Sequence, residues 1–273
     1  MIEEKAYAKI NLVLDVVKKR EDGYHELQMV MIPIDLYDTL TFEESDSITL
    51  VADVEIENNA ILKSAEIMKI RFNVEKGAKI SLQKRIPVGA GLGGGSADIA
   101  ATLRGLNQLW KLDLQLEDLE ELALELGSDT LFCLYNKPAL VYGRGENLLF
   151  VEMPEIETIY LMTSKINVST AHVFKHHKIK YKAKRFDKLF RNYLNQKYSL
   201  FFKKTYNKLT QTTLKCYPAL KRVYKDAKRV DSHAMMSGSG STFYILANKQ
   251  NATILEDKFT KYGIQYLKTK PKT

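Results

Sequence analysis

The sequence predicts an α+β fold, and three stretches carry that prediction. Residues 78–82 alternate apolar and polar side chains, which is the period of a strand with one buried face. Apolar residues then recur at helical spacing from Ile99 to Trp110, and leucines mark a second helix over 112–127. Residues 234–246 read as a strand, a loop of small residues and a second strand.

A glycine-rich stretch from Pro87 to Asp98 separates the first strand from the first helix, and five of its residues are glycines. At a helix N-terminus the first N–H groups lack partners and the helix dipole is positive, so an anion is favoured. Glycine also lets the backbone adopt positive φ and approach a phosphate closely. The stretch therefore predicts a phosphate-binding loop rather than a simple turn, with Ser96 or Asp98 capping the helix.

Three known phosphate loops do not fit. A Walker A loop needs lysine where Gly95 stands. Gly89, Gly91 and Gly94 match G-x-G-x-x-G, but a dinucleotide fold needs a strand after the helix, and a second helix follows instead. The V-A-I-K, H-R-D and D-F-G motifs of protein kinases are absent. What remains is a loop that holds phosphate mainly through its backbone and the helix dipole.

The stretch Pro87-Val-Gly-Ala-Gly-Leu-Gly-Gly-Gly-Ser-Ala-Asp98 resembles the ATP loop of the GHMP kinases. Ala8-Lys-Ile-Asn-Leu12 and Lys19-Arg-Glu-Asp-Gly-Tyr-His-Glu26 are similar to the branch of that family that phosphorylates a cytidyl-linked sugar alcohol in non-mevalonate isoprenoid synthesis. The resemblance implies a ribosomal-protein-S5-like domain over residues 1–154 and a ferredoxin-like domain over 155–273. It is thinnest between 175 and 230.

The resemblance implies transfer of the ATP γ-phosphoryl group, with Mg²⁺, to a hydroxyl of a methylerythritol moiety. Asp129 would accept the hydroxyl proton, and Lys9 would keep Asp129 ionised and favour the alkoxide. Asn59 would lie near adenine, although Asn59 and Asp129 are also ordinary helix-cap residues. The other implied nucleotide-binding residues are Pro87, Gly89, Ala90, Gly91, Leu92, Gly93, Gly94, Gly95 and Ser96, with Ser96 as the expected Mg²⁺ ligand.

The implied acceptor site holds a cytosine ring between Tyr24 and Phe174, with His25 reading the edge of the base. The remaining implied substrate residues are Asn11, Thr170, Gly238 and Ser239. The chain departs from the family pattern at Leu131 and Ser241, where proline is usual.

The remaining elements follow from local patterns. A strand over 5–16 buries Ala6, Ala8, Ile10, Leu12 and Leu14 and leaves Lys9 and Asn11 on its other face. A helix begins at Asn59 with Ile61, Leu62, Ala65 and Met68 inward, and another begins at Ser169 or Thr170. The other expected elements are strands within 29–42, 46–56, 139–146, 158–162 and 265–267 and helices within 186–229.

Composition limits the partners. The net charge is +8, and much of it lies in residues 175–185. No nucleic-acid-binding motif accompanies these lysines, so we expect a solvated surface rather than a nucleic-acid site. The sequence contains no run of 18 apolar residues, so we expect no membrane span. The acidic start lacks a signal peptide, which predicts a cytoplasmic protein. Two cysteines are too few for a disulfide framework, and the Cys and His spacing predicts no zinc site.

The expected partners are ATP and the cytidyl substrate, and the chain would be a monomer or homodimer. Two alternatives stay open. One is a homoserine or mevalonate type of GHMP kinase, which needs no cytosine pocket. The other is a basic RNA-binding protein on a degenerate kinase fold, which predicts no turnover and steep salt dependence.

Overall fold

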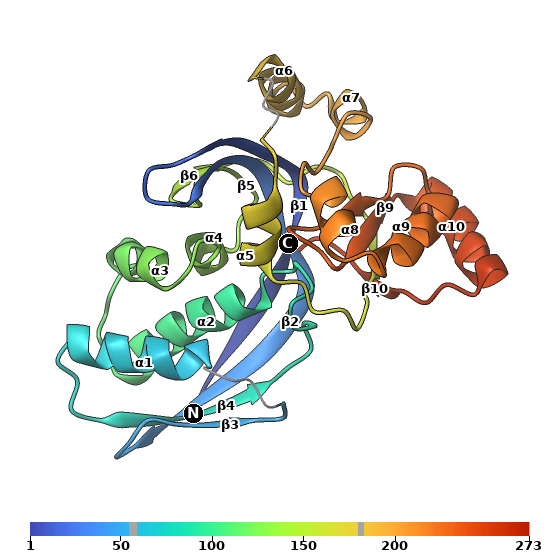
Figure 1. The fold of residues 1–273 in the computed structure, drawn as a ribbon. Helices are drawn as coiled ribbons and strands as arrows, with labels where there is room; N and C mark the ends of the chain where they lie inside the picture. Colours follow the sequence, from blue (N-terminus) through green and yellow to red (C-terminus); the bar gives the residue numbers. More distant parts are fainter. Residues whose placement is uncertain (55–58, 180–182, 273) are drawn as a thin grey trace. The chain divides into compact units, whose positions relative to one another are not determined.

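Two long strands, β1 (Ile2–Lys19) and β2 (His25–Ser45), run through both compact units of the chain (Figure 1). The computed structural model describes residues 1–54, 59–179 and 183–272. Unit 1 comprises Met1–Ala8, Leu36–Pro87 and Gly93–Lys137, and unit 2 comprises Lys9–Asp35, Val88–Leu92 and Pro138–Thr273. The boundary near residue 154 stays a prediction.

In unit 1, β4 (Gly77–Gln83) pairs antiparallel with the end of β2 and parallel with β3 (Thr49–Ala52). The helical elements of this unit are α1 (Ala60–Arg71), α2 (Gly94–Leu109), η1 (Glu117–Leu119), α3 (Glu120–Leu126) and α4 (Thr130–Tyr135). Helix α2 packs against α1 and α4. It also lies close to the sheet, because a Cβ atom on Gly105 would be only 2.3 Å from the Phe42 ring.

In unit 2, the start of β2 pairs antiparallel with β5 (Ala139–Gly143), and β5 pairs with β6 (Asn147–Phe150). A second antiparallel sheet has the order β10-β7-β9-β8, with bounds β7 (Thr158–Met162), β8 (Met235–Met236), β9 (Phe243–Ala247) and β10 (Leu267–Thr269). The helices are α5 (Thr170–His176), α6 (Ala183–Leu194), α7 (Tyr198–Phe202), α8 (Thr210–Cys216), α9 (Leu220–Val230) and α10 (Lys249–Tyr262).

The second sheet confirms the predicted ferredoxin-like half. Numbered by their order in the chain, its four strands follow one another across the sheet as 4-1-3-2, and α10 connects the last two strands in the chain, as expected for a β-α-β-β-α-β unit. In the connection where the simple unit has one helix, the described residues form α5 to α9. Helices α9 and α10 pack on β9.

Most predicted elements are present, and the errors have physical reasons. Neither Ser96 nor Asp98 caps α2, because the helix starts earlier, after Gly93 in the left-handed conformation. Leu62 is exposed rather than inward, since the buried stripe of α1 runs through Ile61 and Met68. The strand predicted over 46–56 is shorter, and residues 55–58 lie outside the described part of the chain.

The basic stretch 175–185 is partly described, since residues 180–182 fall outside the described ranges. Its described residues Lys175, Lys178 and Arg185 are exposed, as expected of a solvated surface. Within the described ranges, no helix has both the length and the apolar character needed to cross a membrane.

Candidate active site

Lys9 and Asn11 are both buried on β1, with exposures of 3% and 0%. Lys9 Nζ donates a 2.8 Å hydrogen bond to Asn11 Oδ1, and the Gly238 N–H donates to the same oxygen at 3.0 Å. A Cβ atom on Gly238 would lie 3.4 Å from Lys9 Nζ. Unit 2 therefore brings three of the predicted site residues together, although they come from opposite ends of the chain.

The first half of the glycine loop is fixed through its carbonyl groups. The four consecutive carbonyl oxygens of residues 89–92 accept hydrogen bonds of 2.8–3.2 Å: Gly89 from Val168 N–H, Ala90 from Thr242 N–H, Gly91 from the Ser237 hydroxyl, and Leu92 from Lys9 N–H. Within the described part of the chain, none of the four N–H groups donates a hydrogen bond. The loop thus turns its acceptors inward and leaves its donors for another partner.

Glycine is required at position 91 by close packing. Its φ is +74°, and a Cβ atom there would lie 2.3 Å from the Ser237 carbonyl oxygen and 2.7 Å from that of Gly240. The loop over 237–240 and the glycine loop therefore touch backbone to backbone. No side chain larger than hydrogen fits between them, which explains why both loops consist of small residues.

The second half of the loop opens helix α2. Gly93 has φ +74° at the N-cap, with no side-chain cap, so the N–H groups of Gly94, Gly95 and Ser96 have no acceptor four residues earlier within the helix. A Cβ atom on Gly95 would meet nothing within 4 Å, and Gly95 is exposed. Free N–H donors at the positive end of a 16-residue helix are an arrangement that favours an anion.

Asp129 occupies the N-cap position of α4, yet its carboxylate makes no capping hydrogen bond to that helix. This argues against the ordinary explanation of a cap. In the same unit, Ser96 Oγ lies 3.6 Å from where a Cβ atom on Gly127 would be, so the start of α2 and the turn before Asp129 are neighbours. Ser96 and Asp129, predicted from separate motifs, therefore belong to one region of unit 1.

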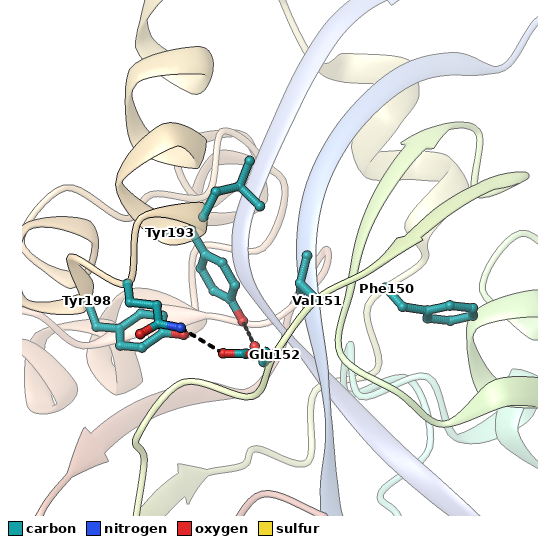
Figure 2. A pocket seen from close by; sticks show the side chains of 7 residues that line it. Phe150, Val151, Glu152, Tyr193 and Tyr198 are labelled. Atoms are coloured by element: carbon teal, nitrogen blue, oxygen red, sulfur yellow. Dashed lines mark hydrogen bonds between the residues drawn. The ribbon is translucent and has the colours of Figure 1, made fainter.

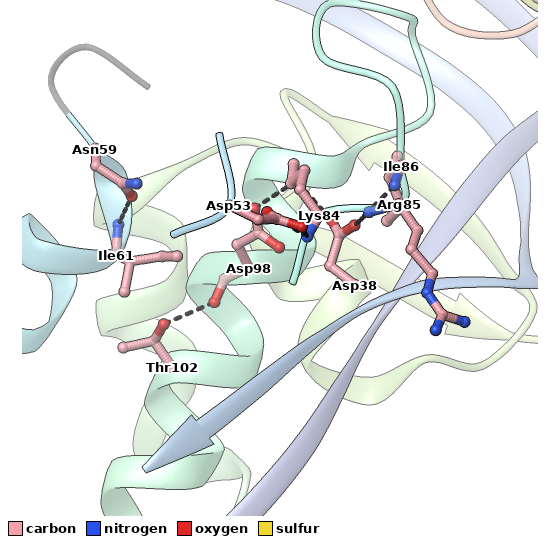
Figure 3. Close-up of polar contacts among 9 residues, drawn as sticks. All are labelled: Asp38, Asp53, Asn59, Ile61, Lys84, Arg85, Ile86, Asp98 and Thr102. Atoms are coloured by element: carbon pink, nitrogen blue, oxygen red, sulfur yellow. Dashed lines mark hydrogen bonds and ion pairs between the residues drawn. The ribbon is translucent and has the colours of Figure 1, made fainter. Parts of the chain in front are cut away.

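A buried cluster of one lysine and two aspartates, which the sequence did not predict, lies beside the segment that leads into the glycine loop (Figure 3). Lys84 Nζ lies 2.5 Å from Asp38 Oδ2 and 2.6 Å from Asp98 Oδ2, with all three side chains at most 6% exposed. Asp38 Oδ1 also accepts from the N–H groups of Arg85 and Ile86. The cluster fixes the backbone just before Pro87 and the first turn of α2.

Burial, together with the nearby Asp38 carboxylate, raises the pKa of Asp98 to about 7, against the lowering effect of Lys84. Asp98 Oδ1 is buried without a hydrogen-bond partner among the described residues. The cluster partners are 14 to 60 residues apart in sequence, so no local pattern could have shown them.

Asn59 caps α1, because its Oδ1 accepts a 2.9 Å hydrogen bond from Ile61 N–H (Figure 3). The ordinary explanation for this residue is thus confirmed, and its Nδ2 group takes no part in that bond. The role of Asn59 beside adenine stays a prediction.

The turn that carries Tyr24 and His25 is built around Arg20. Its guanidinium contacts Asp22 at 3.0 Å, Glu26 at 3.1 Å and Glu146 at 2.9 Å. Glu146 also accepts from the Arg144 and Gly145 N–H groups, and a Cβ atom on Gly143 would lie 2.2 Å from its carboxylate. The Gly143-Arg-Gly-Glu146 motif therefore braces the turn before Tyr24.

His25 lies against Phe174, with ring centroids 5.0 Å apart, so these two predicted substrate residues are neighbours. Tyr24 is 48% exposed, and its ring faces the Arg144 guanidinium at 5.0 Å, so Arg144 helps to position that ring. Burial and then the charge of Lys19 lower the pKa of His25 below 6.5. Thr170, on the same helix as Phe174, shares a 2.8 Å hydrogen bond with Ser239.

A separate hollow of about 430 Å³ lies at Glu152, beside α6 and α7 (Figure 2). Tyr193 donates its hydroxyl hydrogen to the Glu152 carbonyl, and Gln196 contacts the Glu152 carboxylate. None of the predicted site residues lines it. Its lining residues are Phe150, Val151, Glu152, Tyr193, Leu194, Gln196 and Tyr198.

Comparison with known proteins finds two family domains in the chain. The N-terminal domain of the GHMP kinases matches residues 59–137, and their C-terminal domain matches 184–265. A 4-diphosphocytidyl-2-C-methyl-D-erythritol kinase from Bacillus pumilus is 41% identical over 251 residues, covering 89% of this chain and 87% of that protein.

Two solved structures are also similar. A crystal structure of 4-(cytidine 5'-diphospho)-2C-methyl-D-erythritol kinase matches with a TM-score of 0.78 and 28% identity over 100% of both chains. Homoserine kinase from Cytophaga hutchinsonii matches with a TM-score of 0.74 and 19% identity, covering 99% of this chain and 95% of that one. The second likeness shows the shared two-domain α+β fold alone.

Proposed function

Because the chain belongs to the GHMP kinases, in the family of the 4-diphosphocytidyl-2-C-methyl-D-erythritol kinases, we propose that it transfers the γ-phosphoryl group of ATP to a hydroxyl of that cytidyl substrate. The enzyme is an ATP-dependent small-molecule kinase. The product would be the 2-phosphate, an intermediate of non-mevalonate isoprenoid synthesis.

The observation that carries this proposal is the orientation of the glycine loop. Four carbonyl oxygens in a row are bound to neighbouring backbone and side-chain donors, so the N–H groups of residues 89–92 are left for an anion. The positive φ angles of Gly89, Gly91 and Gly93 allow this orientation. Such a row of N–H donors, followed by a helix N-terminus, suits the phosphates of ATP.

The residues around the loop also fit Mg²⁺. Mg²⁺ usually takes most of its ligands from phosphate and water and few from the protein. The Ser96 hydroxyl makes no hydrogen bond among the described residues and belongs to the first turn of α2, so we assign it as the protein ligand. When bound, the ion would neutralise charge on the phosphates.

Phosphoryl transfer requires positioning and charge stabilisation more than covalent chemistry. Asp129 would accept the proton of the acceptor hydroxyl, in keeping with a carboxylate that caps no helix. Lys9 would stabilise the alkoxide that forms, since its ammonium is buried and held by Asn11. Gly238 and Ser239 would position the acceptor through the loop that binds Asn11 and Thr170.

The acceptor side of the proposal rests on the aromatic residues of unit 2. Tyr24 and Phe174 would enclose cytosine, and neutral His25 would hydrogen-bond its edge. A homoserine or mevalonate type of kinase has no use for such a group. The 41% identity to the Bacillus pumilus relative, against 19% to a homoserine kinase, supports the same choice.

The test is phosphoryl transfer itself. We expect the full chain with ATP and the cytidyl substrate to release ADP, to lose this activity without Mg²⁺, and to give one phosphomonoester in the ³¹P spectrum. Absence of turnover, together with RNA binding that weakens steeply with salt, would instead support the degenerate-fold alternative.

A further inference from the structure

Helices α5 and α8 bring together three side chains that the proposed reaction does not use. Among the residues that the structure describes, His172, His176 and Cys216 each offer one ligand atom, and no two of these atoms are more than 4.8 Å apart. Both histidines are exposed, and Cys216 is half-buried. We propose that these side chains form a binding site for a borderline transition-metal cation such as Zn²⁺.

The two histidines have the spacing for joint ligation. His172 and His176 are four residues apart on α5, which places them on one helix face, and their ring centroids are 4.3 Å apart. The His176 Nδ1 atom lies 2.8 Å from the His172 carbonyl oxygen. A carbonyl only accepts hydrogen bonds, so Nδ1 carries the proton and Nε2 keeps its lone pair.

This arrangement is that of a metal ligand. A metal-binding histidine usually donates its second ring N–H to a carbonyl or carboxylate, which fixes the tautomer and the ring orientation. The hydrogen bond from His176 to the His172 carbonyl already supplies this support. The ring of His176 is thus pre-oriented before any ion binds.

Cys216 completes the donor set from a second helix. It is the last residue of α8, and the next residue, Tyr217, accepts a 3.0 Å hydrogen bond from Ser169 N–H at the start of α5. That bond holds the two helix ends together. In a tetrahedral zinc site, ligand atoms are about 3.4–3.6 Å apart. Small rotations of the three side chains, which move each ligand atom by roughly 1 Å, would bring them to that spacing.

The donor chemistry selects the class of ion. Two imidazoles and one thiolate suit Zn²⁺, Co²⁺ or Cu²⁺ and do not suit Mg²⁺, which prefers oxygen ligands. Because the histidines are exposed, water would take the fourth position. The bound ion would tie α5 to α8 and so fix the helix that carries Thr170 and Phe174.

Cobalt is the direct probe of this site, since tetrahedral Co²⁺ absorbs visible light and a thiolate ligand adds a charge-transfer band. We expect one equivalent of Co²⁺ to bind the chelator-treated full chain, with both features, and Zn²⁺ but not Mg²⁺ to displace it. The charge-transfer band reports Cys216, because the other cysteine, Cys133, is buried in α4.

Matched variants separate this site from adventitious binding. Cys216→Ser should abolish the charge-transfer band, and His176→Ala should weaken Zn²⁺ binding at least tenfold, since loss of even an outer partner of a metal ligand lowers affinity about 10–100-fold. His233→Ala changes an exposed histidine outside the cluster and should bind as the wild type does. No tetrahedral cobalt spectrum, or a spectrum unchanged in both cluster variants, would overturn the proposal. Melting curves without metal establish that the variants fold.

Discussion

Lys9 Nζ donates a 2.8 Å hydrogen bond to Asn11 Oδ1 although both side chains are buried on β1. A buried ammonium is unfavourable unless its charge is compensated and hydrogen-bonded. Asn11 contributes to this and is itself held by Gly238 from the far end of the chain. This buried ammonium is consistent with the proposed role of Lys9 beside a developing negative charge.

Replacing Asp129 by Asn should lower turnover by about a hundredfold or more, the range for losing a general base. The loss in the free energy of unfolding should be smaller than that for a helix cap, because the carboxylate makes no capping hydrogen bond to α4. Steady-state ADP release measures the first quantity and chemical denaturation the second.

A suitable control is Asp118→Asn, which alters a carboxylate that accepts a 2.8 Å hydrogen bond from Gln115 N–H. It should affect folding more than turnover. Wild-type turnover in Asp129→Asn would instead assign Asp129 to the turn before α4.

Gly93→Val should abolish ATP binding, because a β-branched residue disfavours the φ of +74° that starts α2 and blocks the approach of a phosphate. Gly263 offers a matched position, since it has φ +61° at the end of α10 and no neighbour within 4 Å of its absent Cβ. Gly263→Val should show similar backbone strain and bind ATP normally. Tight calorimetric binding of ATP by folded Gly93→Val would contradict the proposed cradle.

Lys84→Met should lower the free energy of unfolding by about 3–5 kcal/mol, the range for breaking a buried ion pair. The change would leave the Asp38 and Asp98 carboxylates facing each other without a cation. Lys79→Met is the control, because Lys79 and Glu43 are 3.8 Å apart and about half exposed. Its loss should stay below about 1 kcal/mol. Equal denaturation midpoints for the two variants would contradict the importance of the cluster.

The predictable parts of the site are those that depend on residues close together in the sequence. The high number of glycines between 89 and 95 predicts a phosphate loop. The alternation of apolar and polar residues over 5–16 predicts β1. Alternation alone would put Lys9 and Asn11 on an exposed face, whereas both faces of β1 are buried at this point. Only the motif resemblance, and not the pattern, separated them from ordinary surface residues.

The parts that escaped prediction depend on contacts distant in sequence. Asp38, Lys84 and Asp98 come from β2, the segment after β4, and α2. His172 and His176 do show helical spacing, but their third partner lies 40 residues later, at Cys216. Helix α2 begins at Gly94, which is two residues before Ser96 and four before Asp98, because Gly93 adopts the left-handed conformation at the N-cap.

The ring of His25 should titrate below its ordinary pKa of 6.5, because burial and the charge of Lys19 both disfavour the imidazolium. The neutral ring then prevails at pH 7, and affinity for the cytidyl substrate should fall only as the pH drops through that lowered pKa. The NMR shift of the ring proton, assigned by its loss in His25→Ala, gives the midpoint. A midpoint at or above 6.5 would contradict this environment.

The proposed cytosine site would distinguish this kinase from homoserine and mevalonate kinases. Its residue Tyr24 is exposed, and the Tyr24 ring faces the Arg144 guanidinium. Stacking on one base contributes about 1–3 kcal/mol, so Tyr24→Ala should raise the Michaelis constant for the cytidyl substrate about tenfold or more. The constant for ATP should hardly change.

The most direct measurement is the ratio of kcat/KM for the cytidyl substrate to that for free methylerythritol phosphate and for homoserine, with wild type and Tyr24→Ala side by side. We expect the wild type to favour the cytidyl compound by at least a hundredfold, since both the stacking and the polar edge contacts of the base are lost with the other acceptors. We expect Tyr24→Ala to reduce that preference about tenfold or more. Equal kcat/KM for methylerythritol phosphate or homoserine in the wild type would contradict the cytosine site and favour another small-molecule GHMP kinase.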